Sequence, residues 1–328
     1  MTYDYGRHFG EIRLTHDLTT LPEERTWRLE APGRDADPHE IVLYLGCNVL
    51  RNSHMIRTVT AIFDRLGLDY VAVGGPTYCC GIVHHRNGDT AASNGMNRRT
   101  VELFQRYKPE EVVMWCPSCM FFYDEIQKFE WPFPVRHTTE FLADRLPSIQ
   151  FTHRVDQAVA LHYHSQSEPR KREGAAGRRL LEAVPGLSLV DVGSEPRFGR
   201  LCTVDVQAQL GQAVWDGLIL DEIDRARAGG AATLATIYHG CQRLICGFET
   251  VRPIAIEHYL AVFARGLGIE FEDRYKTFRL WQDPERVLEE STPCQTANHV
   301  DPGRARQLVE KTFGRIATAF DAKGAAAS

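Results

Sequence analysis

Three stretches of the sequence decide the fold: IVLYLGC (41–47), YVAVGGPTYCCG (70–81) and EVVMWCPSC (111–119). Each contains a short apolar run that leads into cysteine, a pattern typical of a buried strand in a parallel sheet followed by a turn. The carboxyl ends of parallel strands meet at one edge of a sheet, where α/β folds place their sites. We therefore expect five cysteines to converge at that edge: Cys47, Cys79, Cys80, Cys116 and Cys119.

Five converging thiolates favour a cluster of soft metal ions. A structural zinc ion takes four ligands, whereas iron–sulfur clusters are held by cysteine thiolates and accommodate more sulfur. The alternative is that these cysteines are buried only as small hydrophobic side chains. The adjacent pair Cys79-Cys80 and the motif Cys116-Pro117-Ser118-Cys119 argue against that alternative.

Strands and helices alternate along most of the chain. Apolar residues at helical spacing predict helices over 53–67, 97–108, 121–131 and 137–146. The same order recurs in the second half, with strands expected at 158–164, 187–193 and 233–240 and helices at 174–184 and 213–230. The segment 251–267 also mirrors 135–146, which indicates an internal duplication. The sequence thus predicts an α/β fold of two pseudo-symmetric βαβ (Rossmann-like) lobes with parallel sheets.

Four segments are expected: an N-terminal extension (1–38), lobe 1 with the full cysteine motif (39–150), lobe 2 with a degenerate motif (151–271) and a C-terminal extension (272–328). The N-terminal extension is polar and predicted to be irregular. The C-terminal extension is predicted to hold one helix, at 305–320, followed by a disordered AKGAAAS tail (322–328).

The arrangement of Cys47, Cys79-Cys80-Gly81 and Cys116-Pro117-Ser118-Cys119 resembles the cysteine-rich CCG domain, most closely that of the B-type subunits of heterodisulfide reductase. The resemblance covers roughly the first half of the ordered chain. It implies that these five cysteines bind a noncubane [4Fe-4S] cluster that is also the catalytic site.

Lobe 2 repeats this pattern with fewer cysteines. His164 or Ser165 stands in place of Cys47, Leu201-Cys202 in place of Cys79-Cys80, and His239-Gly240-Cys241 in place of the CxxC motif, with Cys246 following. Three cysteines are too few for a second noncubane cluster. A metal site is therefore expected from Cys202, Cys241, Cys246 and one histidine, either His239 or His164. Zinc and a small iron–sulfur cluster with mixed ligands both fit this set, and an empty vestigial site is the alternative.

Composition excludes several classes of protein. The 328 residues are 43% hydrophobic and carry a formal net charge of −5, which argues against a nucleic-acid partner. No apolar run reaches the length of about 18 residues that a transmembrane helix needs, and the first residues lack the apolar core of a secretory signal. Nine cysteines without such a signal indicate a reducing compartment, so a cytoplasmic location is expected.

The resemblance implies an iron–sulfur subunit of a heterodisulfide-reductase-like complex, of the kind found in bacterial sulfur oxidation. Such a subunit performs redox chemistry on thiols and disulfides, and a protein-bound lipoyl group is one candidate substrate. It acts only together with flavin-containing and ferredoxin-like iron–sulfur partner subunits. Two alternatives stay open. One is an electron-transfer CCG subunit of a glycolate, lactate or glycerol-3-phosphate dehydrogenase-like complex, and the other is a zinc-binding scaffold subunit.

Overall fold

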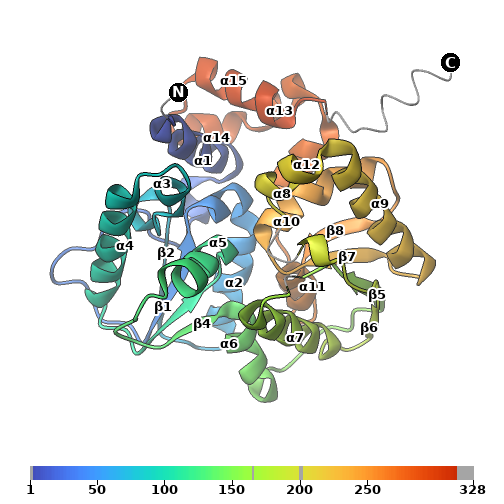
Figure 1. Ribbon diagram of the computed structural model, residues 1–328, viewed down its shortest axis with the longest axis horizontal. Helices are drawn as coiled ribbons and strands as arrows, with labels where there is room; N and C mark the ends of the chain where they lie inside the picture. Colours follow the sequence, from blue (N-terminus) through green and yellow to red (C-terminus); the bar gives the residue numbers. More distant parts are fainter. Residues whose placement is uncertain (1–2, 165, 199–201, 316–328) are drawn as a thin grey trace. The chain divides into compact units, whose positions relative to one another are not determined.

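The computed structural model describes residues 3–164, 166–198 and 202–315. The chain divides into two compact units, Met1–Phe141 with Ser291–Leu308 and Leu142–Glu290 with Val309–Ser328. Each unit is built on a four-stranded parallel sheet flanked by helices (Figure 1). This architecture confirms the predicted α/β fold with two Rossmann-like lobes.

The first sheet has the order β2-β1-β3-β4. Its strands are β1 (Ile41–Gly46), β2 (Tyr70–Gly74), β3 (Glu111–Met114) and β4 (Val135–His137). Every residue of the central strand β1 is buried, as expected for a parallel strand covered by helices on both faces. The strand β4 was not predicted, because Val135-Arg136-His137 is too short and too polar to stand out as an apolar run.

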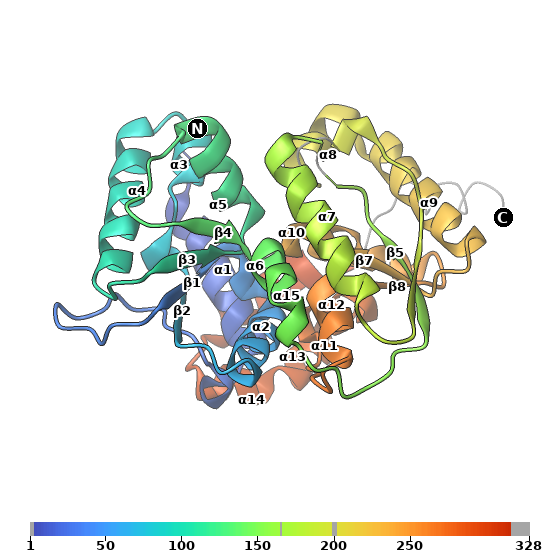
Figure 2. The ribbon, with the colours of Figure 1, turned by 90° about the horizontal axis from the view of Figure 1, so that it is seen from below.

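Several helices belong to the first unit. They are α1 (Tyr5–Thr19), α2 (Ser53–Arg65), α3 (Ile82–Arg86), α4 (Thr90–Gln105), α5 (Pro117–Phe121) and α14 (Thr292–Ala297). Alternate residues of β1, Val42 and Tyr44, belong to one core cluster with Phe104 of α4 and Met120 of α5. These two helices therefore cover the same face of the sheet, as Figure 2 shows. After α5 the chain continues as a π-helix (Phe122–Gln127), where an α-helix was expected over 121–131.

The N-terminal segment folds as a helix, which differs from the irregular extension expected. Asp4 caps α1 by accepting a hydrogen bond of 2.8 Å from the backbone N–H of Arg7. Ile12 and Leu18 are fully buried, although the helix as a whole is polar. Its polar composition hid this helix from a prediction based on apolar periodicity.

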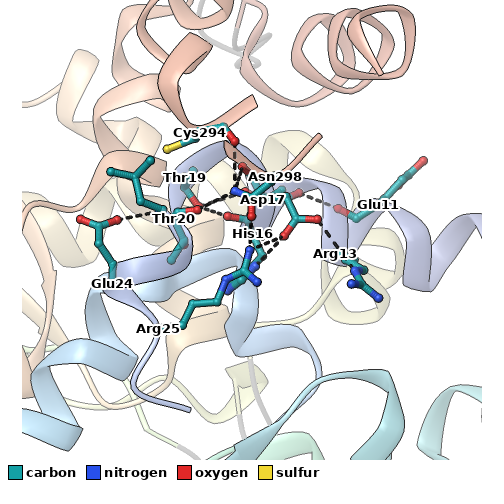
Figure 3. Close-up of polar contacts among 12 residues, drawn as sticks. Glu11, Arg13, His16, Asp17, Thr19, Thr20, Glu24, Arg25, Cys294 and Asn298 are labelled. Carbon is teal, nitrogen blue, oxygen red and sulfur yellow. Dashed lines mark hydrogen bonds and ion pairs between the residues drawn. The ribbon is translucent and has the colours of Figure 1, made fainter. Parts of the chain in front are cut away.

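Helix α1 is held by a segment that lies far away in the sequence. The side-chain amide of Asn298, just after α14, donates to the backbone carbonyls of Asp17 (2.9 Å) and Thr20 (2.8 Å), where α1 ends. Arg25 donates to the side chains of both Asp17 and Asn298 (Figure 3). These bonds satisfy carbonyls that the helix end leaves without helical partners, and they tie residues 291–308 to the first unit.

The second sheet repeats the first, with the order β6-β5-β7-β8. Its strands are β5 (Gln157–Leu161), β6 (Leu187–Val190), β7 (Thr233–Thr236) and β8 (Ala255–His258). The accompanying helices are α7 (Glu168–Glu182), α8 (Val204–Leu210), α9 (Gln212–Ala228), α10 (His239–Ile245) and α11 (Tyr259–Arg265). The repeated strand order agrees with the internal duplication seen in the sequence.

The last part of the described chain is richer in helix than expected. It contains α12 (Arg274–Trp281), α13 (Pro284–Glu290), α14 and α15 (Pro302–Phe313), where one helix at 305–320 was predicted. The AKGAAAS tail lies outside the described residues.

The remaining helix, α6 (Thr138–Asp144), follows β4. Among the residues described, no helix combines the length and the apolar character needed to cross a membrane.

Candidate functional site

The five cysteines of lobe 1 follow three neighbouring strands at one sheet edge. Cys47 comes directly after β1, Cys79 and Cys80 come after the short 3-10 helix (Pro76–Tyr78) that follows β2, and Cys116 and Cys119 come after β3. Cys116 is the N-cap residue of α5. All five side chains are buried, with exposures of 1% to 7%. The structure therefore brings together all five residues that the sequence predicted would converge.

Neighbouring thiols of the group shift one another's pKa. Cys47 acts on the pKa of Cys79, Cys79 on that of Cys80, Cys80 on that of Cys119 and Cys119 on that of Cys116. All nine cysteines of the chain lie in described residues, and none of them forms a disulfide. The site is thus a compact group of five buried sulfur atoms from three loops.

The five thiols differ in the direction in which their surroundings shift the pKa. The hydrogen bonds from Cys47 and Cys80 lower the pKa of Cys79 well below its usual range, and the hydrogen bond from Cys119 lowers the pKa of Cys116. The pKa of Cys47 is raised by its bond to Cys79 and by burial, and that of Cys119 by its bonds to Cys116 and Cys80. Two thiols therefore ionise first while their neighbours donate to them. Since the thiolate is the form that binds metals, the group is prepared to take up a cation.

Two glycines allow this close packing. Gly46 has φ +77°, and a side-chain Cβ there would lie 2.7 Å from the Cβ of Cys116 and 3.3 Å from the Sγ of Cys119. Gly81, the glycine of the Cys-Cys-Gly motif, has φ +92°, and a Cβ there would lie 2.5 Å from the carbonyl oxygen of Ser93 in α4. Both positions combine a left-handed backbone with lack of space, which restricts them to glycine.

Two tyrosines that sequence analysis did not single out border the sulfur group. The Tyr44 hydroxyl donates to the backbone carbonyl of Tyr78 at 2.6 Å and lies 3.5 Å from the Sγ of Cys119. Burial, and then the charges of Cys80 and Cys119, raise the pKa of Tyr123. Its hydroxyl is buried and has no hydrogen-bond partner among the described residues. In the sequence both tyrosines fit equally well as core aromatic residues, so no local signal distinguished them.

The sheet register fixes which residues of the two lobes correspond. In lobe 1 the His137 ring bonds to the carbonyl of Trp115 (3.3 Å), and in lobe 2 the His258 ring bonds to the carbonyl of Ile237 (2.8 Å). Each histidine ends the last strand of its sheet and pairs with the neighbouring strand in the same register. Trp115 therefore corresponds to Ile237.

When this correspondence is continued along the chain, the cysteine motifs of the two lobes align one residue differently from the alignment made on sequence alone. Cys116 corresponds to Tyr238, and both are N-cap residues, of α5 and α10 respectively. Cys119 corresponds to Cys241, and His239 falls opposite Pro117. On the first strands, Ile41 pairs with Glu111 and Val159 pairs with Thr233, so that His162 corresponds to Tyr44.

Lobe 2 brings together a smaller group of potential metal ligands. The ligand atoms of His162, Cys202 and Cys241 all lie within 4.8 Å of one another, and all three side chains are buried. The His162 Nε2 lies 2.9 Å from the Sγ of Cys202, and its Nδ1 lies 2.6 Å from a carboxylate oxygen of Glu222 in α9. The hydrogen bonds from Cys202 and His162 lower the pKa of Cys241 to about 5 despite its burial.

The group differs from the predicted ligand set in its other members. Cys202 and Cys241 come together as expected, but Cys246 donates to the backbone carbonyl of Arg243 at 3.7 Å. His164 lies 3.2 Å from the Tyr238 hydroxyl. His239 is buried, and burial lowers its pKa to about 3. The one-residue shift explains the difference, because it places His239 opposite Pro117 and not opposite Cys116. Ser165 and Leu201 lie outside the described residues.

Comparisons with known proteins agree with this description. Residues 41–123 match the family model of the cysteine-rich CCG domain. The chain is 23% identical over 254 residues to a subunit of the dihydromethanophenazine:CoB–CoM heterodisulfide reductase of Methanosarcina barkeri, covering 71% of this chain and 60% of that protein. It is 25% identical over 178 residues to a probable membrane-anchored ferredoxin of Chromohalobacter salexigens, covering 51% of this chain and 26% of that protein. It is also 22% identical over 174 residues to EtfAB:quinone oxidoreductase of Syntrophomonas wolfei, covering 51% and 24% respectively.

The chain spans about 60% of the length of the heterodisulfide reductase subunits that it matches. The family match begins at Ile41, the first residue of β1, and ends at Tyr123, so it contains all five cysteines of the sulfur group. Residues 41–123 carry the CCG cysteine-rich domain, and the chain is homologous to heterodisulfide reductase subunits over about 70% of its length.

Proposed function

We propose that this chain is an iron–sulfur subunit of an oxidoreductase complex, and that Cys47, Cys79, Cys80, Cys116 and Cys119 bind its cluster. The observation that carries the proposal is the group of five buried thiols that follow three neighbouring strands at one sheet edge. A donor set made only of sulfur is the kind that iron–sulfur clusters prefer. The match to the CCG family supports the same assignment.

The surroundings of the five thiols also fit a bound cluster. The buried Tyr123 hydroxyl borders Cys80 and Cys119 and has no hydrogen-bond partner among the described residues, and such orphaned donors are rare in a folded interior. A sulfur-rich anionic group held by these cysteines would accept its hydrogen bond. Tyr44 and the two glycines Gly46 and Gly81 would keep the five sulfur atoms in place.

The finer proposal concerns the reaction. A noncubane [4Fe-4S] cluster in this position would supply single-electron transfer next to a sulfur substrate. We assign the chain to thiol and disulfide redox chemistry of sulfur metabolism, on a small disulfide or a protein-bound lipoyl group, because the relatives that cover most of the chain are named as heterodisulfide reductase subunits. Opening a disulfide needs two electrons, so the chain would act with flavin-containing and ferredoxin-like partner subunits.

A second candidate function is electron transfer without a substrate of its own. It is favoured by the relatives named as a ferredoxin and as an EtfAB:quinone oxidoreductase, which match about half of this chain. In this case the same five cysteines would hold a cluster that only relays electrons between partner proteins.

Anaerobic purification of the full chain tests the cluster. We expect about four iron and a matching amount of acid-labile sulfide per chain. Single Cys80→Ser and Cys119→Ser substitutions should abolish the visible absorbance and the EPR signal. Cys294→Ser is the matched control, because Cys294 is also buried in the first unit but lies in α14, outside the sulfur group. Full iron content and unchanged spectra in variants of all five cysteines would refute the assignment.

Titration with a dithiol separates the two candidate functions. If the chain acts on sulfur, dihydrolipoamide should change the EPR spectrum of the oxidised protein in a saturable way. Each lipoamide should reoxidise two reduced chains, because the disulfide takes up two electrons and each cluster gives one. If the chain only relays electrons, the spectrum should not respond to either compound, while a reduced ferredoxin should still reduce it.

A further inference from the structure

The group formed by His162, Cys202 and Cys241 has no role in the function proposed above. It lies in lobe 2, among residues that correspond to the cluster site of lobe 1. Cys241 corresponds to Cys119, and the Sγ atoms of Cys202 and Cys241 lie within 4.8 Å of each other, as Cys80 and Cys119 belong to one buried cluster in lobe 1. The position of Cys116 is occupied by Tyr238, whose side chain cannot bind iron through sulfur.

The loss of sulfur is accompanied by the gain of a nitrogen ligand. The strand position of Tyr44, which borders Cys119 in lobe 1, is occupied in lobe 2 by His162. The His162 Nε2 lies 2.9 Å from the Sγ of Cys202, and the ligand atoms of all three residues lie within 4.8 Å of one another. Two thiolates and one imidazole are a typical ligand set for zinc.

Glu222 gives this histidine the environment of a metal ligand. Its Oε2 lies 2.6 Å from the His162 Nδ1, and its Oε1 accepts a hydrogen bond of 2.6 Å from the backbone N–H of Tyr163. Both carboxylate oxygens are therefore engaged, and the carboxylate fixes the ring so that Nε2 faces the two sulfur atoms. Metal-binding histidines almost always have such a partner on the second ring nitrogen.

We propose that lobe 2 holds a mononuclear zinc site formed by His162 Nε2 and by the Sγ atoms of Cys202 and Cys241, with Glu222 as a positioning residue. Within the part of the chain that the structure describes, no fourth histidine, cysteine or carboxylate joins the group. Cys246 does not complete it, since its thiol bonds to the carbonyl of Arg243. Three protein ligands leave one position for an exchangeable ligand, as in catalytic zinc sites and unlike closed structural ones. Thiolates and water are ligands of suitable chemistry for this position.

Metal analysis of the full chain, purified anaerobically with its cluster, tests the proposal. We expect about one zinc per chain, lost in Cys202→Ser, Cys241→Ser and His162→Gln variants that keep their iron. Cys246→Ser is the matched control and should keep both metals. The reverse variant, Cys119→Ser, should lose iron and keep zinc. The two sites therefore fail independently, and a failure of the zinc assignment is distinguishable from a failure of the cluster assignment.

Two further measurements do not depend on how well the ligand variants fold. Zinc X-ray absorption of the wild-type chain should show two sulfur ligands at about 2.3 Å and a nitrogen ligand at about 2.0–2.1 Å. Glu222→Gln should weaken zinc binding about 10–100-fold in competition with a chromophoric chelator, without loss of helical circular dichroism. In the cobalt-substituted chain, 2-mercaptoethanol should shift the visible bands by entering the open position.

Several results would overturn the proposal. Zinc content that does not respond to the three ligand substitutions would place zinc elsewhere. A Cys202–Cys241 disulfide in the metal-free wild-type chain, found by mass spectrometry after anaerobic isolation, would make the pair a redox dithiol. Iron with acid-labile sulfide that disappears in Cys241→Ser would make lobe 2 a second cluster site. A visible spectrum of the cobalt-substituted chain that does not change on addition of 2-mercaptoethanol would show that the metal has no open coordination position.

Discussion

Tyr44 in β1 and His162 directly after β5 occupy corresponding positions, and each borders the cysteine that lies in the first turn of the helix after the third strand of its lobe. In lobe 1 the residue is a phenol that bonds to a backbone carbonyl beside five thiols. In lobe 2 it is an imidazole that lies against two thiols and is held by a carboxylate. One scaffold therefore presents two different sets of side chains, and the difference is concentrated in a few residues at the carboxyl ends of the strands.

The Tyr123 hydroxyl is expected to tune the cluster of lobe 1. Hydrogen bonds to cluster sulfur stabilise the reduced, more negative state and raise the reduction potential. Tyr123→Phe should therefore lower the potential measured by EPR-monitored redox titration, while iron content is unchanged. In the metal-free protein the same substitution should change the free energy of unfolding by less than about 0.5 kcal/mol, because the hydroxyl has no partner there among the described residues.

Tyr44→Phe is the matched control for Tyr123→Phe. It removes a buried hydrogen bond to the carbonyl of Tyr78 and should cost about 1–3 kcal/mol in the metal-free protein as well. Equal stability losses for both variants, with no change of potential for Tyr123→Phe, would contradict a contact between Tyr123 and the cluster.

Gly46 is expected to be essential for the five-sulfur group. Gly46→Ala introduces a methyl group 2.7 Å from the Cβ of Cys116, so α5 must move away and Cys116 and Cys119 move with it. We expect loss of most of the iron, measured per chain after anaerobic purification.

Gly88→Ala separates the clash at Gly46 from backbone strain. Gly88 has φ +81°, close to the +77° of Gly46, but nothing lies within 4 Å of its added Cβ. It should cost only about 1–2 kcal/mol of left-handed strain and keep its iron. Equal iron loss in both variants would mean that strain alone is responsible.

Much of the fold and of the lobe 1 site was predictable because strand and site coincide in the sequence. Cys47, Cys79 and Cys116 follow the apolar runs of β1, β2 and β3 within five residues, so one pattern predicted both the sheet and the convergence. In lobe 2 the three residues His239-Gly240-Cys241 were aligned with the four residues of the CxxC motif, whereas Tyr238 occupies the first position of that motif. Only the paired strands resolve this ambiguity.

His162 was harder to recognise as a site residue. It follows an apolar strand and lies three residues before Ser165, which was one of the positions aligned with Cys47. Its role depends on Glu222, sixty positions later in the sequence, and no local pattern links the two. Helix α1 was also missed, because it is polar and its C-terminal end is held by Asn298, which lies far away in the sequence.

Asn298 is expected to stabilise the first unit. Asn298→Ala leaves the carbonyls of Asp17 and Thr20 without the side-chain amide that they accept from, and it removes the acceptor of Arg25. The expected loss in the free energy of unfolding is about 1–3 kcal/mol, measured by urea denaturation of the metal-free protein.

Asn87→Ala controls for the general effect of losing an asparagine side chain. The Asn87 amide donates to the carbonyl of Val83 on an exposed helix end, so its loss should cost less than about 0.5 kcal/mol. An equally small effect for Asn298→Ala would show that residues 291–308 are held by other contacts.

Stability of the second unit should fall as the pH rises through neutrality, because of Glu173. This side chain is 1% exposed, pairs with Arg170 at 2.5 Å and accepts a hydrogen bond of 2.6 Å from Tyr238. Burial, opposed by Arg170, raises its pKa from 4.5 to about 7.

Between these two pKa values the folded state holds a proton that the unfolded state has released. The stabilisation that Glu173 gives is therefore fully present below pH 4.5 and is lost as the pH rises through 7. The linked free energy is on the order of 3 kcal/mol. Glu173→Gln resembles the protonated carboxyl, so it should change stability little at acid pH, and it should flatten the decline between about pH 4.5 and pH 7 in urea titrations. Glu182→Gln, at the exposed end of the same helix, should keep the wild-type slope; an unchanged slope in Glu173→Gln would place the titrating group elsewhere.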